Sequence, residues 1–209
     1  MKEITRKKHL EMKLQSIPSH PNPKIGLEQY TTPSVIASDL IWNAFSLGDI
    51  ENKSVLDLGC GTGIFAIASA LMGADLSIGV DIDSDSIEIA SLVSEKLNAG
   101  NLEFICSDIC EFNEEINVNT IFQNPPFGSQ KNAENGQDLK FVKKAIDLKP
   151  DVLYSFHMAS TEEFLINYYQ GNDLDITHIF RYKFPIPKIY DFHNREKYEV
   201  DVIVIRALI

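Results

Sequence analysis

The segment Ser54–Ile64 constrains the fold of this chain more than any other part of the sequence. It begins with apolar residues at positions 55, 56 and 58, a pattern typical of a buried parallel strand, and it continues into glycines at 59, 61 and 63. Glycine lets the backbone turn tightly and approach a ligand closely, and a helix is expected to follow, from Ile64 to about Met72. A strand, a glycine-rich turn and a helix in this order predict the first unit of a doubly wound sheet.

Apolar runs alternate with helical stretches along the rest of the chain. We expect strands near 54–59, 76–81, 102–106, 119–123, 152–157, 175–184 and 199–208, with helices between the first five. Such alternation implies a mainly parallel sheet, whereas the last two strands lack a long helix between them and should pair antiparallel. The expected fold class is therefore α/β: a doubly wound, Rossmann-like, mainly parallel seven-stranded sheet with one antiparallel strand.

The length of 209 residues suits one large α/β domain and is too short for two comfortable ones. Met1–Lys13 is charged with scattered apolar residues and is expected to form a short amphipathic helix, followed by the proline-rich connector Ser16–Pro23. Pro33 then suits the first turn of a helix that runs to about Phe45. We therefore expect a single domain, with an N-terminal helix and connector over 1–26 and the core over 27–209.

Acidic residues accompany the first three expected strands. Asp57 lies just before the glycines, Asp81 ends the second strand, and Asp108 follows the third with the apolar Ile109 beside it. The carboxyl ends of parallel strands meet at one edge of a sheet, so these side chains should converge on one ligand. A carboxylate at the tip of the second strand can accept both hydroxyls of a ribose, and residues 108–109 would lie where an adenine ring lies.

The spacing of the glycines bears on which cofactor binds. A dinucleotide site favours G-x-G-x-x-G, whereas this chain has G-x-G-x-G after Asp57. An acid at this point would repel a pyrophosphate and would attract a cation such as an amino-acid ammonium. The pattern resembles the loop of class I methyltransferases that binds S-adenosylmethionine, which implies S-adenosyl-L-methionine as the cofactor.

A rigid turn follows the short apolar run at 120–123 and consists of Asn124, Pro125, Pro126 and Phe127. Both prolines fix φ near −65° and lack an N–H, so the carbonyls of Asn124 and Pro125 can face a ligand. Together with the Asn124 amide and an aromatic ring that can stack, they suit a planar NH₂ group, and these four residues are the candidate catalytic set. The alternative is a plain turn, because Asn-Pro and Pro-Pro are common in loops.

This turn resembles the (Asn/Asp)-Pro-Pro-(Phe/Tyr/Trp) motif of amino-methylating enzymes. Together with Gln29–Pro33 and the segment Tyr154–His157, it resembles the methyltransferase-like rRNA adenine-N6 methyltransferases, a family shared by archaea and eukaryotes. The likeness covers nearly the whole chain from about Leu27. It implies methylation of N6 of an adenosine in ribosomal RNA, and it adds positions from the upstream segment and from the glycine loop to the cofactor site. The expected cofactor-binding residues are Gln29, Thr32, Asp57, Gly59, Gly61, Thr62, Ile64, Asp81, Asp108 and Ile109.

The chemistry expected of such a site is mainly positioning and electrostatics. The Asn124 side-chain oxygen and the Pro125 carbonyl would each accept one N–H of the amine, which favours a more nucleophilic nitrogen. No strong base is required, because the proton can leave after transfer, so neither His157 nor His193 is assigned as a base. A base within a duplex would have to be flipped out and stacked on Phe127, and 128–136 is expected to be a mobile substrate loop.

Three other functions compete with this one. A protein N5-glutamine methyltransferase also acts on a planar NH₂ group, but those enzymes typically carry Tyr after the two prolines. An adenine-N6 DNA methyltransferase usually has a target-recognition domain, for which this length leaves no room. A non-catalytic scaffold is the third, and it would have no need to retain both the cofactor and the catalytic residues.

A net charge of −11 is unusual for a protein that binds nucleic acid without a partner. Local basic segments could still contact RNA, and a partner could supply further positive charge. The candidate contacts are Lys2, Arg6, Lys7, Lys8, Lys131, Arg181, Lys183, Lys188, Arg195 and Lys197. The three cysteines, Cys60, Cys106 and Cys110, do not have zinc-ligand spacing, so we expect no metal site and reduced thiols in a cytoplasmic protein.

The third strand should lie at an edge of a sheet with this topology. Its sequence, Leu102–Cys106, is apolar and contains neither proline nor lysine, so it invites pairing with another chain. The family resemblance implies a small zinc-binding activator subunit that covers such an edge. The alternatives are coverage by the N-terminal helix or by a second copy of the chain.

Overall fold

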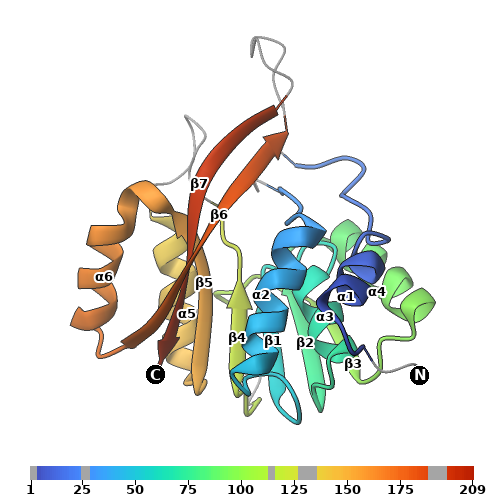
Figure 1. Cartoon of the computed structure of the whole chain (residues 1–209), viewed down its shortest axis with the longest axis horizontal. Coiled ribbons are helices and arrows are strands. Elements are labelled where there is room, and N and C mark those ends of the chain that lie inside the picture. The colour runs from blue at the N-terminus through green and yellow to red at the C-terminus, as the bar shows by residue number, and fades with distance from the viewer. Residues whose placement is uncertain (1–3, 25–28, 113–115, 127–135, 188–196) are drawn as a thin grey trace.

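The computed structural model describes residues 4–24, 29–112, 116–126, 136–187 and 197–209. Seven strands form one sheet in the order β3-β2-β1-β4-β5-β7-β6 (Figure 1). Neighbouring strands from β3 to β5 are parallel, and β7 runs antiparallel to both β5 and β6. The predicted fold class is therefore confirmed. The strands are β1 (Ser54–Leu58), β2 (Leu76–Asp81), β3 (Leu102–Cys106), β4 (Thr120–Gln123), β5 (Val152–Met158), β6 (Asp175–Pro187) and β7 (Lys197–Leu208).

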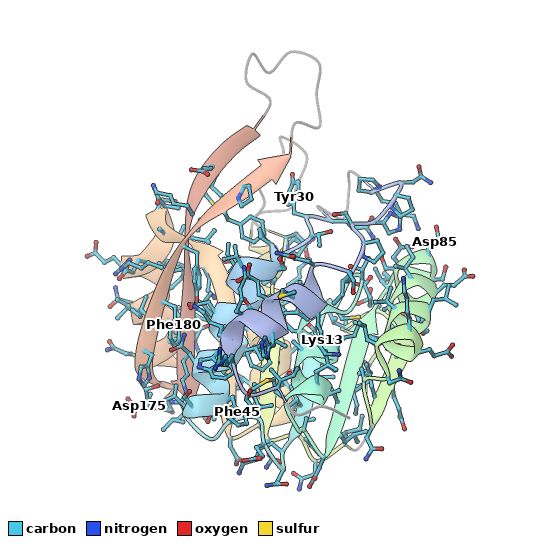
Figure 2. All side chains as sticks on the ribbon, turned by 45° about the vertical axis from the view of Figure 1, so that its right-hand side comes forward. Lys13, Tyr30, Phe45, Asp85, Asp175 and Phe180 are labelled. Atoms are coloured by element: carbon cyan, nitrogen blue, oxygen red, sulfur yellow. The ribbon has the colours of Figure 1, made fainter. Side chains whose placement is uncertain are left out.

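Helices cover both faces of the sheet, and side chains fill the space between the layers (Figures 1 and 2). The helices are α1 (Lys7–Leu14), α2 (Ser34–Ser46), α3 (Ile64–Leu71), α4 (Ser84–Leu97), α5 (Gln137–Leu148) and α6 (Glu162–Gly171). One buried cluster contains side chains of α1 to α4, and a second contains side chains of α5 and α6. Among the described residues, no helix has the length and apolar character that a bilayer crossing requires.

Alternate residues of the central strands divide between these two clusters. Phe122 of β4 faces the first cluster, whereas its neighbour Ile121 faces the second. The Phe122 ring is fully buried and stacks between Phe65 of α3, at 5.6 Å between ring centroids, and Tyr154 of β5, at 4.8 Å. Burial on both faces explains why these strands are apolar runs without polar alternation.

The N-terminal helix packs against α2 and does not stand apart from the core. Leu10 and Leu14 of α1 are buried in the same cluster as Leu40 and Ile41 of α2. The expectation of a short amphipathic helix is thus confirmed for residues from Lys7 onward. The connector therefore begins on the face of the sheet that α1 and α2 cover. From there, the residues after the connector can reach the carboxyl edge of the sheet.

Two local expectations are wrong. The described residues between β3 and β4 contain no helix, because Phe112 and Val118 of this connection bury their side chains directly in the second cluster. A helix, α6, instead occupies the connection after β5, where none was expected. The next helix along the chain, α5, begins after Gly136, whose φ of +84° is left-handed, and Asp138 lies inside its first turn.

Candidate active site at the carboxyl edge of the sheet

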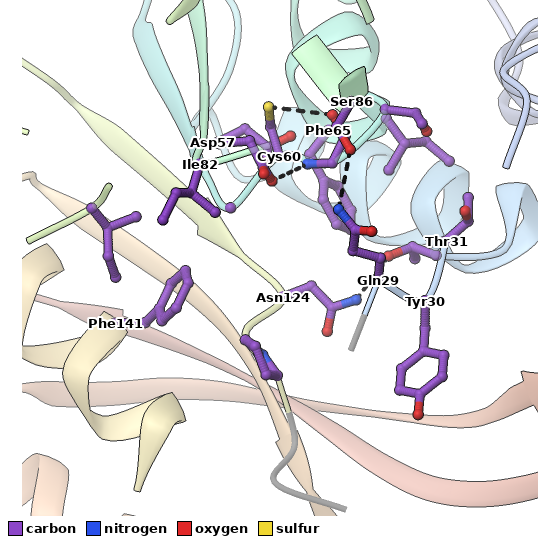
Figure 3. Close-up of a pocket in the computed structure, with 18 of the residues that line it drawn as sticks. Gln29, Tyr30, Thr31, Asp57, Cys60, Phe65, Ile82, Ser86, Asn124 and Phe141 are labelled. Atoms are coloured by element: carbon purple, nitrogen blue, oxygen red, sulfur yellow. Dashed lines mark hydrogen bonds between the residues drawn. The ribbon is translucent and has the colours of Figure 1, made fainter. Parts of the chain in front are cut away.

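A cavity of about 510 Å³ opens where the strand order reverses between β1 and β4 (Figure 3). Parallel α/β sheets bind ligands at such a switch point, and this volume is typical of small-molecule and cofactor sites. The ten residues expected to bind a cofactor all line this cavity. They are Gln29, Thr32, Asp57, Gly59, Gly61, Thr62, Ile64, Asp81, Asp108 and Ile109.

Asp57 reaches the cavity from β1 and also caps a helix. Gly63, at the start of α3, provides no side-chain cap, and the Asp57 carboxylate accepts a hydrogen bond of 3.0 Å from the backbone N–H of Ala66. The side chain is only 1% exposed, and burial raises its pKa from 3.8 to about 7, with a contribution from the nearby Asp81. An ionised Asp57 is therefore costly in the free protein, and a cation in the cavity would stabilise it.

Asp81 ends β2 with both carboxylate oxygens held by backbone groups. One oxygen accepts from the N–H of Gly61 at 2.8 Å, and the other accepts from the N–H of Asp83 at 2.9 Å. Burial raises the pKa of this carboxyl above its usual value. A carboxylate oxygen can accept more than one hydrogen bond, so this fixed group retains capacity for hydroxyls in the cavity.

The glycine loop lies close to two aromatic rings. A Cβ atom on Gly59 would stand 2.9 Å from the Phe141 ring, and one on Gly63 would stand 2.8 Å from the Phe104 ring. Both glycines also have positive φ, at +71° and +83°. Larger residues at these positions would therefore strain the loop and push the rings away from it.

The opposite side of the cavity is less polar. Ile109 lines it together with Ile82, which directly follows the acid at the end of β2 and is 53% exposed. Asp108 accepts a hydrogen bond of 2.8 Å from the N–H of Cys110, so part of its carboxylate closes a local turn. The two isoleucines offer apolar contact for a flat ring in the cavity.

Asn124 points into the cavity from the end of β4. Its Nδ2 donates to the Thr32 hydroxyl at 3.0 Å (Figure 3), whereas its Oδ1 is buried and has no hydrogen-bond partner among the residues that the structure describes. Pro126 also lines the cavity, whereas Pro125 is buried and is not among the lining residues. Phe127, the fourth candidate catalytic residue, lies outside the described residues.

The segment before α2 is bonded to the turn between β2 and α4 through Lys24, Gln29 and Asp83, a set of contacts that we call the latch. Gln29 donates to Asp83 at 2.5 Å, and its side-chain oxygen accepts from the backbone N–H of Lys24 at 2.7 Å. The Lys24 ammonium lies 2.5 Å from the same Asp83 carboxylate. Burial alone would raise the pKa of Asp83, but these hydrogen bonds lower it to about 2. The latch holds Gln29 and the residues after it over the cavity.

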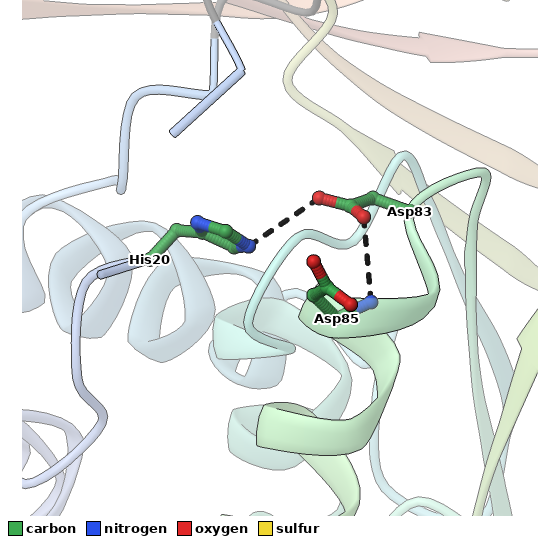
Figure 4. Close-up of side chains that lie close together, drawn as sticks. All are labelled: His20, Asp83 and Asp85. Carbon is green, nitrogen blue, oxygen red and sulfur yellow. Dashed lines mark hydrogen bonds and ion pairs between the residues drawn. The ribbon is translucent and has the colours of Figure 1, made fainter. Parts of the chain in front are cut away.

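His20 belongs to the same cluster, together with Asp83 and Asp85 (Figure 4). Its Nδ1 accepts from the N–H of Asn22 at 3.1 Å, so the neutral ring carries its proton on Nε2, which lies 3.3 Å from Asp83. A protonated Nε2 is not a metal ligand, and Lys24 already supplies a cation to this carboxylate. The cluster therefore serves to fix the N-terminal segment.

Sequence reasoning did not assign several residues that line the cavity. They are His20, Tyr30, Thr31, Cys60, Phe65, Ile82, Ser86, Cys110, Gln137, Lys140 and Phe141. Some of them directly adjoin a predicted site residue, and that adjacency was a usable signal. The three from α5, at 137, 140 and 141, had no local signal, because only packing brings the first turn of that helix to the cavity.

His157 has the structural role expected of it. It is fully buried, with Nδ1 3.0 Å from Asp138 and Nε2 3.1 Å from the Tyr169 hydroxyl. It does not line the cavity. The bond to Asp138 ties the first turn of α5 to β5, and the bond to Tyr169 ties α6 to the same strand, so His157 supports the wall of the site without facing a ligand.

Several candidate RNA contacts are occupied by acidic neighbours. Arg181 pairs with Glu162 through two hydrogen bonds of 2.6 and 2.7 Å, and Lys183 lies 2.6 Å from Asp201. Lys7 and Lys8 are likewise paired, with Asp39 and Glu11. Exposed pairs of this kind are worth about 0–1 kcal/mol, so a phosphate can compete for them. Lys2, Lys131, Lys188 and Arg195 lie outside the described residues, as does the Lys197 side chain.

Comparison with known proteins identifies the family. Residues 36–151 match the model of the methyltransferase small domain. An uncharacterised protein of Methanocaldococcus jannaschii is 41% identical across 97% of this chain and 94% of its own length. The rRNA N(6)-adenosine-methyltransferase METTL5 of Danio rerio is 32% identical across 95% of this chain and 97% of its own length. The crystal structure of a candidate RNA methyltransferase from Pyrococcus horikoshii superimposes with a TM-score of 0.87, at 35% identity over 98% of both chains. The chain therefore belongs to the methyltransferase small domain family, in the branch that contains the METTL5 proteins.

Proposed function

We propose that this methyltransferase transfers a methyl group from S-adenosylmethionine to N6 of an adenosine in ribosomal RNA. The observation that carries the proposal is the Asn124 Oδ1 atom, a buried acceptor on a cavity-lining residue that finds no hydrogen-bond donor within the described part of the chain. Leaving such a group unpaired costs about 1–3 kcal/mol, and an N–H donor in the cavity would remove that cost. The choice of ribosomal RNA is supported by the likeness to METTL5.

The residues of the cavity suit the parts of the cofactor. The fixed Asp81 carboxylate would accept the ribose hydroxyls, and Asp57 would face the ammonium of the methionine end. The apolar surfaces of Ile82 and Ile109 would contact the adenine ring, with Asp108 beside it. When bound, S-adenosylmethionine supplies an electrophilic methyl group on its sulfonium.

The turn after β4 would hold the target amine. Asn124 Oδ1 and the Pro125 carbonyl would each accept one N–H, which draws the nitrogen away from planarity and frees its lone pair. Catalysis then depends on positioning, and the proton of the amine can leave to solvent after transfer. The ring of Phe127 would stack on the base, as predicted from the sequence.

A protein partner would complete the enzyme. β3 is an edge strand of the sheet, and its Leu102, Phe104 and Ile105 are only partly buried. An exposed edge of this kind can pair with another chain. We propose a small zinc-binding activator subunit at this edge. Since Arg181 and Lys183 are paired with acids, such a partner would also supply positive charge for RNA.

The substrate is tested by mass spectrometry of modified nucleosides. Ribosomal RNA from cells that lack the protein should lose one N6-methyladenosine, and the purified enzyme should restore it in vitro. Asn124→Ala, which keeps the cofactor cavity, is the matched control and should not restore it. Unchanged N6-methyladenosine in the deleted cells, or transfer to a glutamine of a protein instead, would reject the proposed substrate.

The partner is tested by size-exclusion chromatography with light scattering, with and without the candidate subunit. A 1:1 complex with higher activity is expected. A charge placed on the edge, Ile105→Glu, should abolish the complex, whereas Leu92→Glu on the exposed face of α4 should not. A stable monomer whose RNA methylation is unchanged by the subunit would rule this partner out.

A further inference from the structure

Thr32 is the only described residue that holds the Asn124 side chain. The two residues are 92 positions apart in the sequence, and the Thr32 oxygen accepts from Asn124 Nδ2 at 3.0 Å. Thr32 is 4% exposed and lines the same cavity as Asn124. One side of the amide is therefore anchored, and the other side, Oδ1, is free to bind a ligand.

The backbone around Thr32 is held on both sides. After it, the Pro33 carbonyl accepts from the N–H groups of Ile36 and Ala37 at 2.9 Å each, which starts α2. Before it, Gln29 is bonded to Asp83 at 2.5 Å. The backbone on both sides of Thr32 is thus held by the fold, and its buried side chain places the hydroxyl oxygen beside Asn124.

The orientation of the Asn124 amide decides whether the site can bind an amine. With Oδ1 toward the cavity the site presents an acceptor, whereas a flipped amide would present its own NH₂ and repel the donors of the substrate. A hydroxyl can either donate or accept, so Thr32 fits both orientations. The direction of the Thr32 proton therefore selects between them.

Among the described residues, none accepts a hydrogen bond from the Thr32 hydroxyl. When this proton is directed to an acceptor in the cavity, the lone pairs of the oxygen face Asn124, and only Nδ2 can bond to them. We propose that Thr32 is a positioning residue: by donating to an oxygen of the bound cofactor, it locks Asn124 with Oδ1 toward the substrate. The role rests on the proposed function, because it assumes an amine substrate.

This arrangement would order the two binding events. Before the cofactor binds, the Thr32 proton can point to Asn124 as well as away from it, so a flipped amide competes with the orientation in this structure, in which Nδ2 donates to Thr32. After the cofactor binds, the amide is fixed as an acceptor. A ligand that selects one of two states shifts their populations by its difference in affinity for them, so cofactor and amine should bind with positive coupling.

The experiment follows the Asn124 NH₂ group by NMR in the ¹⁵N-labelled full chain. Its signals are assigned by their loss in Asn124→Asp. Adding S-adenosylhomocysteine should slow the solvent exchange of these protons at least tenfold in the wild-type protein and in Thr32→Ser. Thr32→Val, which matches threonine in shape, should show no slowing. Thr31→Val is the control, since it removes a neighbouring hydroxyl that lines the same cavity but does not bond to Asn124.

Kinetics provide the second readout. Thr32→Val should lower kcat for RNA methylation about 5- to 150-fold, the range expected when one buried hydrogen bond is left unmade, and should raise KM for the cofactor much less. Thr32→Ser should recover most of the rate.

The two readouts separate the proposals. The role of Thr32 is overturned if S-adenosylhomocysteine slows the exchange of the Asn124 NH₂ protons equally in Thr32→Val and in the wild type. It is also overturned if the wild-type protein shows no slowing. Slowing confined to the proteins with a hydroxyl at position 32 supports it. A wild-type enzyme that methylates no RNA adenosine instead rejects the proposed substrate, whatever the NMR result.

Discussion

Replacing Asp57 with asparagine tests whether this carboxylate faces the cationic end of the cofactor. The substitution removes the charge but keeps an oxygen that can accept from the N–H of Ala66, so the cap of α3 is retained. In the free protein, burial raises the pKa of Asp57 to about 7. A cofactor ammonium requires the ionised form, so affinity should rise with pH until that pKa is passed.

The size of the effect follows from the ionised fraction. With a pKa of about 7, Asp57 is about half ionised at pH 7 and roughly 3% ionised at pH 5.5. Affinity for S-adenosylhomocysteine should therefore be roughly tenfold weaker at pH 5.5, which corresponds to about 1–2 kcal/mol. The same shift destabilises the free fold: because the folded pKa lies above 3.8, stability is lost as pH rises from about 4 to 7. At pH 7, Asp57→Asn should therefore raise the free energy of unfolding by up to about 4 kcal/mol.

Calorimetry of S-adenosylhomocysteine between pH 5.5 and 7 measures the affinity, and urea unfolding measures the stability. Asp57→Asn should bind about tenfold or more weakly at pH 7, because a charge-assisted hydrogen bond is lost, and its affinity should change less with pH. Any remaining slope belongs to other groups such as Asp81, whose pKa is also raised by burial. If the affinity of the wild-type protein and that of Asp57→Asn change equally with pH, the assignment of Asp57 to the cationic end of the cofactor is wrong.

Four further changes have defined outcomes. Asp81→Ala should weaken S-adenosylhomocysteine binding at least about tenfold by calorimetry, since hydrogen bonds to a charged group are worth about 1.5–3 kcal/mol; unchanged affinity would show that Asp81 does not bind the ribose. Asn124→Ala should lower kcat roughly 100-fold yet change cofactor affinity less than about threefold, and comparable losses in both would contradict its role at the amine. Phe122→Ala should cost about 3–5 kcal/mol in urea unfolding, because it empties the space between two stacked rings; a cost below 1 kcal/mol is incompatible with that packing. Asp83→Asn should reduce stability above pH 4, with the difference disappearing as pH falls toward 2, the pKa of the folded state; a difference independent of pH would exclude the latch.

The sequence alone was sufficient for the strands and for the edge at which the expected cofactor-binding residues gather. Apolar runs buried on both faces, such as Thr120–Gln123, are recognisable because a parallel strand has helices on both sides. In this topology every parallel strand ends at the same edge, so Asp57, Asp81 and Asp108 had to lie near one another once the strands were assigned. The order of the strands follows from chain connectivity, which is also why β3 was expected at an edge.

The tertiary structure decided the contacts between segments that no local pattern connects. The hydrogen bond from Asn124 to Thr32, the latch of Gln29 on Asp83 and the wall formed by the first turn of α5 all depend on how helices pack on the sheet. The described residues between β3 and β4 form no helix for the same reason, because burial of Phe112 outweighed helix formation there. Periodicity in a sequence reports which face of a segment is buried. It carries no information on which distant side chain completes a hydrogen bond, and that pairing is settled only by the packing of the whole chain.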